Sequence, residues 1–183
     1  MLVGMSAFSS ISLVYMIETL GATSLQVSII FGLVFLSIVP GSFLGAVITK
    51  KMNPISSWKT SILLFSVTTT FGALILTRPE RIHFAYIFGI LWGILMGWFY
   101  SIEDLIFSLS LPDSEESRLT GFFIYCRNIL SWLPPLLFTA LNEIGVSMQW
   151  GLMSLVGFYF IAVLFLELMA PWEKVLEKAR SSS

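Results

Sequence analysis

Six long apolar stretches, separated by short polar ones, dominate the chain. Each is long enough for an α-helix to cross the hydrocarbon core of a bilayer, which takes about 20 residues. The fourth is expected to continue as helix to Leu111, because Pro112 is the first residue that stops it. The pattern predicts an all-α integral membrane protein with one transmembrane domain, residues 1–170, and a short tail, residues 171–183. The six predicted transmembrane helices are residues 1–20, 26–49, 58–77, 82–111, 119–141 and 147–170.

The composition agrees with this prediction. Hydrophobic residues make up 56% of the 183 residues and charged residues 11%, whereas a typical soluble domain is about 25% charged. Such a chain has too little polar surface to face water on all sides. The formal net charge of −1 provides no basic surface for nucleic acid.

Lysine and arginine residues between the apolar stretches predict the orientation, because cytosolic loops carry an excess of them. One side of the predicted bundle carries seven, and the other carries only Arg78 and Arg81. We therefore expect the loops 50–57 and 112–118 and the C-terminus to be cytosolic. The seven are Lys50, Lys51, Lys59, Arg118, Lys174, Lys178 and Arg180.

Prolines suggest that the six helices are two copies of three. The second helix of each triplet has proline inside the predicted span, Pro40 in the first and Pro134–Pro135 in the second. Each is expected to free backbone carbonyls and kink its helix. Matching prolines in two triplets are typical of inverted-repeat transporters. In the alternative, the prolines do not indicate a repeat, because membrane helices often tolerate proline.

Three glycines spaced four residues apart, Gly89, Gly93 and Gly97, share one face of the fourth predicted helix. A face without side chains lets a neighbouring backbone approach closely. The pattern fits a static packing surface, and it also fits a helix that slides or rocks against its neighbour.

Two adjacent carboxylates, Glu103 and Asp104, follow the glycines. Asp104 lies eight residues before Pro112, which is about 12 Å of helix, and a carboxylate inside the membrane costs roughly 2.5–3.5 kcal/mol. Arg127 lies nine residues after Arg118, so we expect it at a similar depth on the next helix. We predict an ion pair of Arg127 with Glu103 or Asp104. In the alternative, the acids face a wet cavity and Arg127 snorkels to the interface.

The sequence lacks the motifs of catalysis. The single histidine, His83, opens the fourth predicted helix, and residues 145–149 do not match the G-x-S-x-G motif of serine hydrolases. No group of His, Cys, Asp and Glu has metal-ligand spacing, and no phosphate-binding loop or nucleotide fingerprint occurs. We therefore expect neither enzymatic activity nor a metal or other cofactor.

The end of the second predicted helix and the loop that follows it contain Gly45-Ala-Val-Ile-Thr-Lys50-Lys51. This segment occupies the place of the G-x-x-x-D-R loop signature of the major facilitator superfamily, with Thr49 where the signature has Asp and Met52 where it has Gly. Together with the six helices, it resembles the C-terminal half of a transporter of that superfamily. On this resemblance residue 1 falls inside the family's seventh helix, and the first half is expected outside this chain. The implied partners are the lipid bilayer, a small-molecule substrate, and the missing N-terminal half or a second copy.

A longer stretch, from Gly93 to Phe138, is similar to the vacuole-effluxer-like branch, the autophagy-related amino-acid exporters of the vacuole. It departs from the branch in two places, because Glu103-Asp104 stands where the branch has Ser-Arg-Ser and Pro134 replaces a glycine. The residues that carry the resemblance are Gly93, Gly97, Pro112, Glu115, Glu116, Gly121–Phe123, Tyr125 and Ser131–Phe138.

This resemblance implies a multi-pass protein of the vacuolar membrane that exports amino acids from the vacuole to the cytosol. In the superfamily the first helix of each triplet lines the path, which here means residues 1–20 and 82–111. Glu103 and Asp104 are then expected to face the path or its cytosolic gate, with Arg127 as their partner. The alternatives are transport of another solute, such as a sugar or a peptide, and a membrane scaffold subunit that transports nothing.

Overall fold

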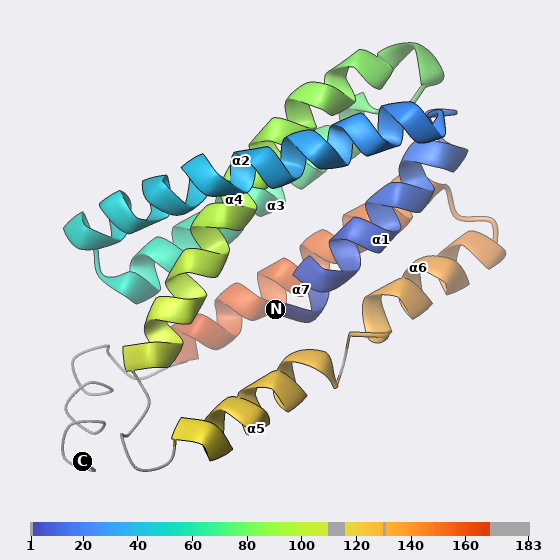
Figure 1. The fold of residues 1–183 in the computed structure, drawn as a ribbon. Coiled ribbons are helices and arrows are strands. Elements are labelled where there is room, and N and C mark those ends of the chain that lie inside the picture. The colour runs from blue at the N-terminus through green and yellow to red at the C-terminus, as the bar shows by residue number, and fades with distance from the viewer. Residues whose placement is uncertain (1, 110–115, 130, 169–183) are drawn as a thin grey trace.

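The computed structural model describes residues 2–109, 116–129 and 131–168 (Figure 1). These residues form helices and turns without a strand, which confirms the all-α prediction. The predicted end of the fourth helix at Leu111 and the predicted tail 171–183 lie outside the described residues. The elements are α1 (Leu2–Glu18), α2 (Ser24–Lys51), α3 (Pro54–Ile75), the 3-10 helix η1 (Pro79–Arg81), α4 (Ile82–Leu109), α5 (Glu116–Asn128), α6 (Leu133–Glu143) and α7 (Met148–Leu168).

Four spans in the described residues are long and apolar enough to cross a membrane. They are α2, α3, the stretch Pro79–Leu109 that includes α4, and α7. Helix α1 is a shorter apolar helix, with 17 described residues. Four of the six predicted spans therefore contain helices that are long and apolar enough to cross a membrane.

The fifth predicted span, 119–141, consists of two helices. Helix α5 ends at Asn128 and α6 begins at Leu133, with Pro134 and Pro135 in its first turn. Proline cannot donate to a preceding helical turn, and it disfavours helical conformation in the residue before it. The first turn of a helix needs no such donor. The structure therefore divides the predicted span into two helices, with these prolines in the first turn of the second, and the kinks at Pro40, Pro134 and Pro135 stay predictions.

The joint between α2 and α3 is built by local capping. Lys50 and Lys51 occupy the last turn of α2, where positive charge complements the helix dipole. Asn53 caps α3 by accepting a hydrogen bond of 3.0 Å from the Ile55 amide, and Pro54 is the first helical residue. A tight turn therefore brings the end of α2 and the beginning of α3 together.

Several of the contacts between helices have counterparts when the two triplets of helices are exchanged. Helices α2 and α3 pack on α4 and on each other, α5 and α6 pack on α1, and α7 contacts α1, α3 and α6 (Figure 1). Consider an exchange of α1 with α4, of α2 with α5 and α6, and of α3 with α7. The contact of α2 with α4 then corresponds to the contacts of α5 and α6 with α1. The pair α3–α4 maps onto α7–α1, and α2–α3 maps onto α6–α7.

An aromatic cluster fills the junction of α1, α3, α4 and α7. Phe8 lies edge-to-face against Phe65 and Trp92, with ring centroids 5.1 and 4.9 Å apart, and Phe65 lies 5.4 Å from Tyr159. All four are buried, and such pairs add about 0.5–1.5 kcal/mol each beyond the area that they bury. The outer surface of α2, by contrast, exposes large apolar side chains such as Phe43, as a lipid-facing helix does.

Candidate functional site

The glycines of α4 lie against the backbone of α2. A methyl group added at Gly93 would meet the carbonyl oxygen of Val34 and lie 2.7 Å from Cβ of Ser37. One added at Gly97 would meet the carbonyl oxygen of Ile38, and one at Gly89 would lie 3.2 Å from Cγ2 of Ile30. No side chain fits at Gly93 or Gly97 without a shift of α2. Sliding of α4 along this surface stays a prediction.

Helix α2 contributes two glycines of its own to the same contact. It continues as one helix through Pro40, and the next residue, Gly41, faces the backbone of Ile94. A methyl group at Gly45 would lie 2.7 Å from both Trp98 Cδ1 and Ser101 Oγ. The glycine seam, which we define as Gly41, Gly45, Gly89, Gly93 and Gly97, therefore holds α2 and α4 at backbone distance.

The two adjacent carboxylates of α4 lie in different surroundings. Glu103 is 2% exposed, whereas Asp104 is exposed. Glu103 lies one helical turn after Phe99 and shares its face of α4, and the Phe99 ring is 5.8 Å from that of Trp58 on α3. Glu103 therefore faces the interior of the bundle, on the side that α3 covers, and Asp104 lies on an accessible face.

The predicted partner of these acids, Arg127, belongs to α5. Its side chain lies outside the described part of the structure. Helix α5 contacts α1, and the ion pair of Arg127 with Glu103 or Asp104 stays a prediction.

A hydrogen-bond network joins α2, α3 and α4 near Lys50. Ser57, which is fully buried on α3, accepts a bond of 3.1 Å from Trp98 Nε1 and lies 3.0 Å from the Thr49 hydroxyl. Thr49 lies 2.7 Å from the carbonyl oxygen of Gly45, to which its hydroxyl donates. A neutral hydrogen-bond network thus joins the three helices at this end of the bundle. Neither Ser57 nor Trp98 belongs to a sequence motif, so no signal in the sequence marks them as part of this network.

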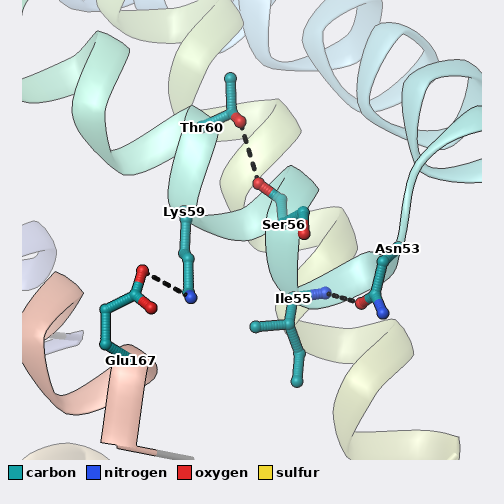
Figure 2. A network of polar contacts seen from close by, with 6 residues as sticks. All are labelled: Asn53, Ile55, Ser56, Lys59, Thr60 and Glu167. Atoms are coloured by element: carbon teal, nitrogen blue, oxygen red, sulfur yellow. Dashed lines mark hydrogen bonds and ion pairs between the residues drawn. The ribbon is translucent and has the colours of Figure 1, made fainter. Parts of the chain in front are cut away.

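An ion pair joins α3 and α7 at the same end of the bundle. Nζ of Lys59 lies 2.7 Å from Oε1 of Glu167, with the two side chains 22% and 62% exposed (Figure 2). Figure 2 also shows the Asn53 cap and the bond of 2.9 Å from Thr60 Oγ1 to the Ser56 carbonyl in the same part of α3. The first turns of α3 therefore hold α2, α4 and α7 together.

A pocket of about 360 Å³ lies beside the network. Lys50 is the charged residue among those that line it. Among the described residues, no group of three or more His, Cys, Asp and Glu side chains is placed to hold a metal ion. The lining residues are Ala46, Thr49 and Lys50 of α2, Pro54 of α3, and Ser101, Ile102 and Leu105 of α4.

The long apolar helices and their lipid-facing surfaces define a multi-pass integral membrane protein. The sequence model of the Major Facilitator Superfamily matches residues 1–182, and the chain therefore belongs to this superfamily. Its members are membrane transporters of small solutes and not enzymes, which confirms the prediction of a transporter at this level. No curated protein and no solved structure matches the chain.

Proposed function

We propose that the chain is the C-terminal half of a transporter, built from two inverted three-helix repeats, that exports amino acids from the vacuole to the cytosol. The helix contacts that map onto one another when the two triplets are exchanged support the repeat. In this arrangement α1 and α4 begin the two triplets and line the path. An N-terminal half or a second copy supplies the opposite wall, and the end that carries Lys50 is cytosolic.

The burial of Glu103 carries the proposal. A carboxylate that is 2% exposed inside a membrane-spanning helix is costly, and such residues mark solute or ion pathways. A carboxylate binds an ammonium group by a charge-assisted hydrogen bond. Amino acids carry such a group and sugars do not, so Glu103 favours an amino acid over a sugar. The exposed Asp104, one residue further on, then belongs to the cytosolic gate.

The proposed direction and substrate are tested in vacuolar vesicles from cells that make the protein and from cells that lack it. Vesicles are loaded with a labelled neutral amino acid, and its release is followed over time. We expect faster release from vesicles that contain the protein. Equal rates would refute the export of amino acids. Faster release of a labelled sugar alone would assign the transporter to another solute.

The role of Glu103 is tested by Glu103→Gln, which removes the charge and keeps the shape. A hydrogen bond to a charged group contributes about 1.5–3 kcal/mol, so we expect release to slow by about ten-fold or more. Glu18→Gln, at an exposed position at the end of α1, is the matched control and should release at the normal rate. If Glu103→Gln also releases at that rate at equal protein abundance, Glu103 does not act in the path.

The predicted ion pair is tested by a double-mutant cycle of Arg127→Ala and Glu103→Gln, with the thermal midpoint in detergent as the measure. If the side chains interact, the double variant should lose less stability than the sum of the single losses. A double variant that loses the full sum would exclude this pair. The same cycle with Asp104→Asn then tests the other carboxylate.

A further inference from the structure

The pocket beside Lys50 lies where a membrane-spanning helix leaves the hydrocarbon. Helix α2 has 28 residues, about 42 Å of helix, whereas the hydrocarbon core is about 30 Å thick. Its last turn, which contains Lys50, therefore reaches the level of the lipid headgroups. The pocket is formed there with the beginning of α3 and the last turns of α4.

The walls of the pocket are apolar and open sideways. Ile102 is buried and forms part of the α4 wall, whereas Ala46 and Leu105 are exposed. Beside them, Val47 presents another exposed apolar side chain on α2. An exposed apolar surface at this level of a membrane protein faces lipid, so lipid can reach the pocket from the bilayer. Its volume of about 360 Å³ lies within the range of small-ligand sites, about 300–1,000 Å³.

Lys50 is the group in this pocket that can bind an anion. The hydroxyls of Thr49 and Ser101 donate to carbonyl oxygens of their own helices, at 2.7 and 2.9 Å. Among the described residues, no carboxylate forms an ion pair with Lys50, whereas Lys59 is paired with Glu167. The Lys50 ammonium group therefore lies at the edge of an apolar pocket, where it can bind an anion.

We propose that this pocket binds an anionic phospholipid, with the headgroup phosphate on Lys50 and the first part of an acyl chain against Ile102 and Leu105. The site combines a cation at headgroup level with an apolar wall below it, which are the two features that a phospholipid matches. In the predicted orientation it faces the cytosolic leaflet, where anionic lipids gather and attract lysine and arginine. The site is separate from Glu103, and the proposal does not depend on which solute is transported.

Native mass spectrometry of the delipidated full chain in detergent tests the proposal. Phosphatidylglycerol, phosphatidylcholine with the same acyl chains, and inorganic phosphate are added in separate titrations. We expect phosphatidylglycerol to bind at the lowest concentration. Lys50→Gln should raise the concentration for half-occupancy by about ten-fold or more, because it removes a charge-assisted hydrogen bond to the phosphate, and Lys50→Arg should restore it.

Two further variants separate the pocket from charge in general. Lys51→Gln removes a neighbouring exposed charge outside the pocket lining, and it should leave binding unchanged. Ala46→Phe fills the pocket and keeps Lys50, and it should weaken binding of phosphatidylglycerol. Equal losses from Lys50→Gln and Lys51→Gln would show diffuse surface attraction and overturn the proposal. Inorganic phosphate that binds as well as the lipid would overturn it also, as a site for free phosphate.

Discussion

Replacing Gly93 by alanine should destabilise the protein, although alanine favours helix. The added methyl group would lie 2.7 Å from Cβ of Ser37, about 0.7 Å short of the 3.4 Å at which ordinary contact begins. It would also meet the carbonyl oxygen of Val34, a backbone atom that no rotamer change can move. Helix α2 must therefore shift as a whole, and overpacking of this kind costs about 1–3 kcal/mol.

The matched control is Gly157→Ala on α7. Gly157 is also helical, and nothing lies within 4 Å of an added methyl group. Both changes gain the same roughly 0.5–1 kcal/mol of helix preference, so the difference between them isolates the strain at the seam. One kcal/mol corresponds to about 2–4 °C in a chain of this size, which places Gly93→Ala roughly 2–12 °C below the control.

Thermal unfolding in detergent, followed by tryptophan fluorescence, measures this difference. Gly32→Ala, at a position in α2 that also has no atom within 4 Å, should behave as the control does and excludes an effect peculiar to α7. If Gly93→Ala melts with or above Gly157→Ala, the backbone contact between α2 and α4 does not exist in the protein.

Two polar contacts at the Lys50 end give contrasting expectations. Ser57→Ala leaves the buried Trp98 Nε1 without its acceptor and should cost about 1–3 kcal/mol. Ser66→Ala, which removes only a bond within α3, should change the melting temperature little, and equal effects would contradict a special role for Ser57. A cycle of Lys59→Gln and Glu167→Gln should give a coupling of less than about 1 kcal/mol that vanishes in 1 M salt, since Glu167 is largely exposed. A larger coupling that resists salt would contradict this.

The four long spans could be predicted from the sequence because length and apolar content alone determine them. The break between α5 and α6 could not be predicted, although Pro134 and Pro135 are visible in the sequence. Pro40 lies inside α2 and leaves it whole, whereas Pro134 and Pro135 begin a new helix. A single proline removes one helical hydrogen bond, and a helix can continue through it. Two successive prolines remove two hydrogen bonds, and they restrict the residue before the pair to non-helical conformations.

The part of the candidate site that could be predicted is the glycine face, because it follows from the spacing of residues along a helix. The spacing of the glycines on α4 predicts that they share one face of the helix. Gly41 and Gly45 on α2 have the same spacing of four residues, which is the signal in the sequence for the opposing face. The difference between Glu103 and Asp104 was not readable, because neighbouring residues point about 100° apart on a helix and burial depends on which face another helix covers. The sequence does not state that α3 covers the Glu103 face.

The glycine seam also has a consequence for how the chain is made. Helix α2 leaves the ribosome before α4, and some 50 residues separate the two sides of the seam, as in the bond of 3.3 Å from Ser42 to the Gly97 carbonyl. Until α4 is inserted, the small-residue face of α2 has no helix to pack on, and lipid or an insertion factor must cover it. A bulky residue at Gly41 or Gly97 would therefore lower the yield of assembled protein during biogenesis, before the stability of the finished bundle comes into play.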